Sequence, residues 1–196
     1  PPESVCSALP VTHAIAFLDR RPLDQPFFLW CSIADPHTPL QTSEPYASMY
    51  DPTDVPIPDQ LEDEMSSKPV AQQLDHKALC GETVSEADIR RVTAMYYGMN
   101  TYIDTEVGRL LDRVETLGLT EDTLIIYVSD HGEYLGEHRM IRKSKAVYDC
   151  LTRIPLIVRW PGQIPTNARR DEFVEIVDLM PTILDACGVK MPAKVK

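Results

Sequence analysis

Asp130 and His131 are neighbours in the chain, and only Ser129 separates them from the apolar run 123–128. A carboxylate and an imidazole held together can ligate a divalent cation. Further oxygen ligands would favour calcium, magnesium or manganese, and further imidazoles would favour zinc. From these residues alone an alternative stands, in which Asp130 caps the next turn and His131 is a hydrogen-bonded loop histidine.

A cluster of cations follows in this otherwise acidic chain: Arg139, Arg142, Lys143 and Lys145. Fixed cations beside a metal suit an anionic substrate, because they lower the free energy of charge that develops on a transferring sulfuryl or phosphoryl group. An equally weighted alternative is that these four cations form a solvated face of the protein and bind no substrate.

His37 lies between Pro36 and Pro39, shortly after the apolar run 26–33. The two prolines restrict the backbone and so hold the imidazole at a set angle. Because its ordinary pKa is about 6.5, a histidine can donate a proton to a leaving oxygen near neutral pH. The alternative is a structural loop histidine.

The sequence contains no Gly-x-Ser-x-Gly nucleophile elbow and no glycine loop of the kind that cradles phosphate. Its five cysteines are scattered, and no pair has the two-residue spacing of zinc or redox motifs: Cys6, Cys31, Cys80, Cys150 and Cys187. We expect free, mostly buried thiols rather than a disulfide framework, and free thiols favour a reducing compartment.

Apolar patterns predict the elements that must position these residues. Three runs that are apolar on both faces are expected to be buried strands covered by helices: 26–33, 123–128 and 154–160. Helices are expected at 11–20, from the capping box at Ser85 to the stop at Gly118, and from Asp178 to Gly188. Gly98 and Gly108 are candidate interruptions of the long helix, and 40–83 is expected to be a long irregular excursion.

Strands that alternate with helices predict an α/β fold with a mixed, mostly parallel sheet between helix layers. In such folds ligands gather at the carboxyl ends of the strands, where His37, Asp130 and His131 are expected. The length of 196 residues suits one domain or most of a larger one. A net charge of −11 argues against nucleic acid as a partner. The sequence shows no apolar run of about 18 residues that could span a membrane and no signal segment.

Taken together, these stretches resemble the sulfatase family of the alkaline-phosphatase superfamily. The matching motifs are collinear and cover roughly residues 14–188: Pro26-Phe27-Phe28-Leu29, Pro36-His37-Thr38-Pro39, Ser129-Asp130-His131-Gly132-Glu133, Leu135-Gly136-Glu137-His138, Lys143, Tyr148-Asp149, the stretch 153–162 and the stretch 177–182. Each motif alone is weak, and the ordered set is specific.

The resemblance implies an alkaline-phosphatase-like fold and a metal-dependent hydrolase of small-molecule or carbohydrate sulfate esters. Asp130 and His131 would be two ligands of a single divalent metal, with calcium expected first and manganese or magnesium as alternatives. Lys143 would neutralise sulfate oxygens, and His37 would assist the leaving group.

Two positions distinguish this chain within the family that it resembles. His131 stands where many arylsulfatases carry asparagine, as in the branch that includes phosphonate monoester hydrolases. A phosphonate monoester or phosphodiester hydrolase is therefore the alternative activity. Arg142 stands where relatives often have glycine, and we expect it to narrow the pocket or to change its charge.

Two parts of the family's site have no match in the sequence. One is the Cys/Ser-x-Pro-x-Arg motif, whose first residue becomes the formylglycine nucleophile, and the other is the earlier aspartate pair that completes the metal shell. Cys6 is followed by Ser-Ala-Leu-Pro, so the nucleophile is not assigned to it. We expect residues 1–196 to be a partial sulfatase catalytic domain that lacks its N-terminal, nucleophile-bearing part and is inactive alone. The remaining alternative is a non-catalytic metal- or anion-binding relative, and the sequence leaves the oligomeric state open.

Overall fold

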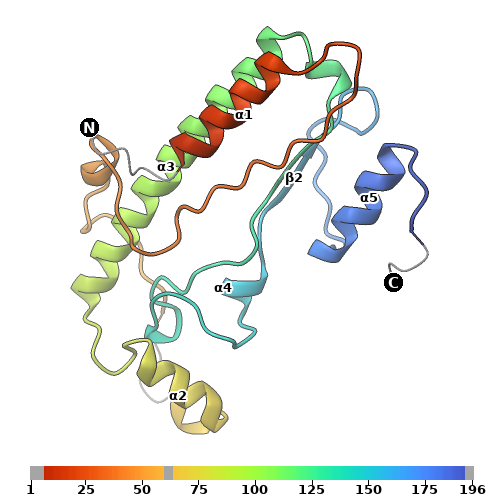
Figure 1. The fold of residues 1–196 in the computed structure, drawn as a ribbon. Coiled ribbons are helices and arrows are strands. Elements are labelled where there is room, and N and C mark those ends of the chain that lie inside the picture. The colour runs from red at the N-terminus through yellow and green to blue at the C-terminus, as the bar shows by residue number, and fades with distance from the viewer. Residues whose placement is uncertain (1–6, 60–63, 193–196) are drawn as a thin grey trace.

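A computed structural model describes residues 7–59 and 64–192 of the chain (Figure 1). The α-helices and strands, in chain order, are α1 (Ala8–Arg20), α2 (Val70–Ala78), α3 (Glu86–Thr116), β1 (Ile125–Val128), α4 (Asp149–Thr152), β2 (Leu156–Arg159) and α5 (Leu179–Ala186). Short 3-10 helices lie at Tyr46–Ser48, Glu64–Ser67, Thr120–Asp122, Glu137–Arg139 and Ile176–Asp178. In these described ranges, no helix is both long and apolar enough to cross a bilayer.

The long helix α3 begins at the predicted capping box. The Asp88 backbone N–H donates to Ser85 Oγ at 3.1 Å, and the Ser85 backbone N–H donates to the Asp88 carboxylate at 3.3 Å. The predicted interruptions at Gly98 and Gly108 are wrong, since α3 is continuous through both. A glycine inside a helix costs only about 1 kcal/mol, and at Gly98 it permits close packing. A Cβ there would lie 2.1 Å from the carbonyl oxygen of Tyr46.

Replacing Ser85 with alanine is expected to lower the free energy of unfolding by about 1 kcal/mol, because the N–H of Asp88 loses its acceptor. Hydrogen bonds from the side chain and backbone of Ser85 lower the pKa of Asp88. The stabilisation from the hydrogen bonds that the Asp88 carboxylate accepts is therefore present above the ordinary carboxyl pKa of about 3.9. It is lost as the pH falls through the lower folded-state pKa. Urea unfolding followed by circular dichroism measures both effects.

The control for this prediction is Ser85→Gly, which is expected to cost only a few tenths of a kcal/mol, as glycine is tolerated at this position. The deficit of Ser85→Ala should shrink in strong acid. A deficit of equal size at neutral and strongly acidic pH would contradict the role of the Asp88 carboxylate.

The predicted helix at 11–20 is confirmed as α1, which packs along α3 (Figure 1). Its buried residues are Val11, Ala14 and Leu18, which share one helix face. An ion pair between Asp19 Oδ1 and Arg113 Nε, 2.6 Å apart, joins the two helices.

Two of the three predicted strands pair with each other. β1 and β2 are antiparallel, with Val128 opposite Leu156, so the carboxyl end of β1 lies beside the start of β2. This is the only strand pair in the described residues, so no parallel pairing of the predicted mixed sheet is seen there. The expected burial of both strands is wrong, because β1 contains no buried residue and every residue of β2 is exposed.

The predicted strand at 26–33 is not a strand in the described part of the chain. It runs as an extended segment, with Phe28 66% and Trp30 70% exposed. A strand requires a neighbouring backbone for its hydrogen bonds, and the described residues supply none along this segment. Its side chains are covered on one face only in part, where Phe27 packs against Phe17 of α1.

Two further expectations are corrected. The region 40–83 is not irregular throughout, because α2 and two 3-10 helices lie within it. Helix α2 has no buried residue, and its apolar Val70 and Leu74 are exposed. Four cysteines are free, but Cys31 and Cys150 are half-buried and Cys80 and Cys187 are exposed. The last two follow the ends of helices α2 and α5, where the chain turns at the surface. Cys6 lies outside the described residues.

Candidate active site

The carboxyl end of β1 delivers Asp130 and His131 through a short turn. Ser129 Oγ donates to the carbonyl oxygen of His131 at 2.8 Å, and the His131 backbone N–H donates to Asp130 Oδ1 at 3.0 Å. These bonds hold the turn together while the Asp130 side chain remains 85% exposed. The second carboxylate oxygen of Asp130 is therefore available to a ligand from solvent.

The imidazole of His131 is oriented by contacts at both nitrogens. Nδ1 lies 2.8 Å from the carbonyl oxygen of Gly132, and Nε2 lies 2.7 Å from Nζ of Lys143. A carbonyl oxygen can only accept and an ammonium can only donate, so Nδ1 carries the proton and Nε2 presents its lone pair. Asp130 Oδ2 is 3.6 Å from the same Nε2. The structure thus brings Asp130, His131 and Lys143 together.

Gly132 holds this turn against α4. Its backbone N–H donates to the carbonyl oxygen of Leu151 at 2.8 Å, and a Cβ at this position would lie 1.9 Å from the carbonyl oxygen of Cys150. Only glycine permits so close an approach of the two backbones. The contact sets the direction in which the chain leaves Asp130 and His131.

Lys143 is held by a residue to which the sequence analysis assigned no role. Tyr134 is 1% exposed and packs with Met140 and Leu151 in a buried cluster. Its backbone N–H donates to the carbonyl oxygen of Arg142 at 2.9 Å, and its hydroxyl lies 2.8 Å from Oγ of Ser144. No spacing or motif in the sequence singles out this tyrosine, because the two contacts depend on how the loop closes.

Glu133 is a second residue near the site whose chemistry the sequence analysis did not assign. Burial raises the pKa of its carboxyl, while the backbone N–H of Tyr134 and the charge of Lys143 act in the opposite direction. Glu133 therefore belongs to the electrostatic surroundings of the lysine. In the sequence, the position of Glu133 in the run Asp130–Glu133 is the signal that could have identified it.

His37 is not brought into contact with the other predicted site residues. Its side chain is exposed, and Nδ1 lies 2.8 Å from the carbonyl oxygen of the neighbouring Thr38. None of the contacts found among the described residues links its imidazole to His131 or Lys143.

The predicted cation cluster divides into separate environments. Arg139 donates to the carbonyl oxygens of Gly81 and Val84, which gives it a structural role. Arg142 and Lys145 are exposed, as the solvated alternative expects, and Lys143 alone of the four faces His131.

Asp130 and His131 supply only part of a metal shell. In the portion of the chain that the structure describes, no three His, Cys, Asp or Glu side chains gather as a metal-binding group. The two residues present fit a divalent cation in donor type, as an exposed carboxylate and a neutral imidazole. The Nε2 lone pair accepts from Lys143 in this structure, so a metal ligated there would replace that contact. Further ligands would have to come from elsewhere.

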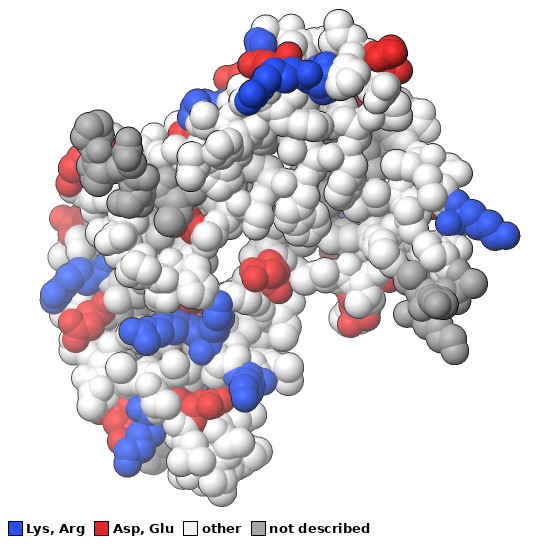
Figure 2. Space-filling view, in the orientation of Figure 1, with Lys and Arg blue, Asp and Glu red and all other residues white. Residues whose placement is uncertain are grey.

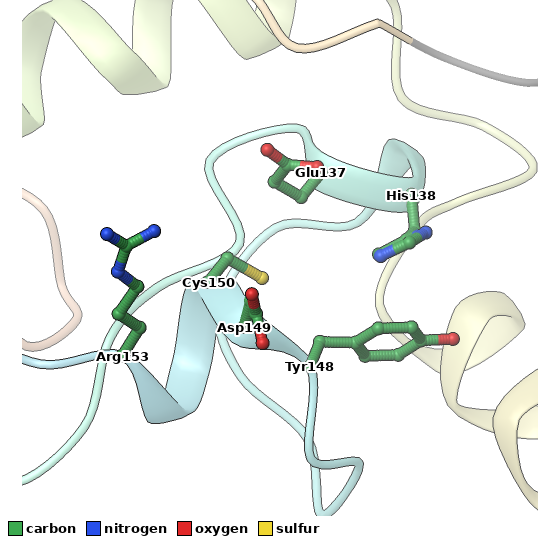
Figure 3. Close-up of a pocket in the computed structure, with 6 residues that line it drawn as sticks. All are labelled: Glu137, His138, Tyr148, Asp149, Cys150 and Arg153. Carbon is green, nitrogen blue, oxygen red and sulfur yellow. The ribbon is translucent and has the colours of Figure 1, made fainter. Parts of the chain in front are cut away.

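A cavity of about 300 Å³ includes residues of α4 in its lining and none of the predicted site residues. Its lining residues are Glu137, His138, Tyr148, Asp149, Cys150 and Arg153. Figure 3 shows Glu137 and Arg153 reaching toward one side and the rings of His138 and Tyr148 at the other. Burial is the largest of the causes that raise the pKa of Cys150 to about 11, so its thiol is protonated at neutral pH and is not an activated nucleophile.

Comparison with protein families gives one match that covers most of the chain. The model of the sulfatase family matches residues 7–189. An arylsulfatase of Clostridium perfringens is 33% identical over 190 residues, which make up 95% of this chain and 39% of the arylsulfatase.

Solved structures show the same relationship. A phosphonate monoester hydrolase from Silicibacter pomeroyi superposes with a TM-score of 0.82 at 32% identity, over 95% of this chain and 39% of the hydrolase chain. A protein solved in complex with its substrate D-glucosamine-2-N,6-O-disulfate superposes with a TM-score of 0.80 at 22% identity, over 97% of this chain and 50% of that one, and shows the shared fold. The chain therefore spans half or less of the length of these relatives, and the predicted alkaline-phosphatase-like α/β fold is confirmed.

Proposed function

The chain belongs to the sulfatase family, and from this premise we propose that it forms the metal- and anion-binding part of a sulfuric ester hydrolase. The observation that carries the proposal is the convergence of Asp130, His131 and Lys143 at the carboxyl end of β1. A cation site beside a fixed ammonium suits an ester whose hydrolysis builds negative charge on sulfuryl oxygens.

Asp130 and His131 would hold one divalent metal, with calcium expected first and manganese or magnesium as alternatives. When bound, the ion would supply positive charge that polarises the ester oxygens. The hydrogen bond between His131 Nδ1 and Gly132 supports this role, because it fixes the tautomer in which Nε2 carries the lone pair. That lone pair would bind the metal in place of its present contact with Lys143.

Lys143 would clamp the sulfate oxygens, and His37 would protonate the leaving oxygen. The position of Lys143 beside the proposed metal ligand supports the first role. The second rests on the resemblance of Pro36-His37-Thr38-Pro39 to the family motif and on the ordinary pKa range of histidine.

The nucleophile of the complete enzyme would be a formylglycine outside residues 1–196, and this chain alone would be inactive. Two observations support a partial catalytic domain. Relatives match this chain over only 39% of their own length. In addition, Trp30 and all of β2 are exposed, and much of the face in Figure 2 between its charged groups is covered by uncharged side chains. Sequencing the reading frame upstream of Pro1 tests this proposal, through the presence or absence of a Cys/Ser-x-Pro-x-Arg motif.

A panel of esters tests the proposed activity. The full-length protein is expected to turn over aryl sulfates with a higher kcat/KM than aryl phosphonate monoesters. Both esters are monoanions with an aryloxide leaving group, and the phosphonate has phosphorus in place of sulfur and a carbon substituent in place of one oxygen. The similarity to a phosphonate monoester hydrolase favours the alternative activity, and a reversed preference would establish it. Carbohydrate sulfates belong in the same panel. Absence of turnover on every ester would favour a non-catalytic metal- or anion-binding protein.

Metal content provides a separate prediction. We expect one divalent ion per full-length chain by elemental analysis, and Asp130→Asn and His131→Ala should each reduce the content at least tenfold, because losing a ligand typically costs more than its second-shell support. Asp149→Asn is the matched control, an exposed carboxylate that lies at the cavity instead. Unchanged metal content in both site variants would remove the assignment.

A further inference from the structure

The backbone at Lys143 is anchored on both sides by one buried residue. Arg142 precedes the lysine and accepts from the Tyr134 backbone N–H at 2.9 Å. Ser144 follows it, with Oγ 2.8 Å from the Tyr134 hydroxyl. Lys143 has a long side chain with about 2 kcal/mol of rotamer entropy, so its ammonium can be placed accurately only if its backbone is held.

The conformation of Arg142 shows why an anchor is needed. Its φ is 72°, in the left-handed region that a residue with a Cβ seldom adopts. Glycine would adopt such a φ without strain. In this chain the bond from Tyr134 to the carbonyl of Arg142 holds the strained turn that directs Lys143 toward His131.

Tyr134 is itself rigid. It is 1% exposed, and its ring packs edge-on against Tyr148 with centroids 5.9 Å apart. Burial is the largest influence that raises the pKa of Tyr134, so its hydroxyl stays protonated at neutral pH. Ser144 Oγ also accepts from the backbone N–H of Ala146 at 3.0 Å, which orients the serine toward the tyrosine.

We propose that Tyr134 is a positioning residue, which sets the place of the Lys143 ammonium through its paired contacts with Arg142 and Ser144. This inference rests on the proposed function of Lys143 as the sulfate clamp. Tyr134 touches no substrate in this arrangement, and it acts only through the lysine.

The test compares Tyr134→Phe and Ser144→Ala in the full-length enzyme. Each removes the same hydroxyl contact and should lower kcat/KM for an aryl sulfate by about 3- to 10-fold, the factor expected of one lost hydrogen bond. Because Ser144→Ala also removes the acceptor of the Ala146 N–H, the double variant should lose no more than Ser144→Ala alone. In a Lys143→Ala background, Tyr134→Phe should have no further effect on kcat/KM.

Tyr148→Phe is the matched control. Its hydroxyl donates to Gln72 Oε1 at 3.0 Å, in helix α2, and its ring packs on the same cluster. It should lower Tm as much as Tyr134→Phe does while changing kcat/KM less than about twofold, since one hydrogen bond is lost in each.

Two results would overturn the inference: equal kcat/KM for Tyr134→Phe and Tyr148→Phe, or an undiminished effect of Tyr134→Phe when Lys143 is already alanine. Its failure is distinguishable from failure of the proposed function. If Lys143→Ala impairs turnover and Tyr134→Phe does not, only the positioning role is lost. If Lys143→Ala leaves turnover intact, the sulfate clamp and the positioning role are both wrong.

Discussion

Lys143→Ala in the full-length enzyme is expected to lower kcat/KM for an aryl sulfate by about 10²- to 10³-fold, the usual cost of removing one preorganised group that stabilises developing charge. The ammonium lies 2.7 Å from Nε2 of His131, so it would face the same anion as the proposed metal. Steady-state kinetics measure the loss. Circular dichroism and metal analysis show whether the variant remains folded and loaded.

The control for this prediction is Lys145→Ala, which removes an exposed cation two residues away and should change kcat/KM less than about twofold, because exposed charges are screened. A similar loss in both variants would mean that general positive charge, rather than the placed ammonium, drives the effect.

His37→Ala should show a different signature from Lys143→Ala. A residue that protonates the leaving oxygen matters most for esters with poor leaving groups, so the loss should be large for alkyl sulfates and small for nitrophenyl sulfate. A loss that is independent of the leaving group would contradict the proton-donor role. Near-normal turnover in both His37→Ala and Lys143→Ala would show that neither residue has its proposed catalytic role.

Gly132→Ala is expected to lower the free energy of unfolding by about 2 to 4 kcal/mol, from overpacking together with a weakened hydrogen bond. The new Cβ would lie 1.9 Å from the carbonyl oxygen of Cys150 and 2.9 Å from its carbonyl carbon, so two backbones must separate. That movement also stretches the 2.8 Å bond from Gly132 to Leu151. Urea unfolding of residues 1–196 measures the change.

Gly108→Ala provides a control of opposite sign. Gly108 lies inside α3, and a Cβ there would meet no heavy atom within 4 Å. This substitution should stabilise the protein by about 0.5–1 kcal/mol, because alanine favours the helix over glycine. If Gly132→Ala were neutral, the contact between the turn and α4 would not hold the site.

Local interactions explain which elements could be predicted. The helix that begins at Ser85 and ends before Gly118 is confirmed, since its capping box and apolar period lie within the segment itself. The strands at 125–128 and 156–159 were found from their apolar runs for the same reason. The segment 26–33 has an equally strong apolar run but forms no strand here, because a strand also depends on a neighbour that its own residues cannot supply.

The sequence by itself determined the family of this protein and the types of residue at the candidate site, because collinear motifs and donor chemistry are properties of residue order. Only the tertiary structure decided that Lys143, and not Arg139, Arg142 or Lys145, faces His131. It also decided that Tyr134 anchors both neighbours of that lysine. These facts depend on how the loop after β1 folds back on itself and on α4. Contacts between residues distant in the chain arise from backbone closure and burial, which no spacing in the sequence encodes.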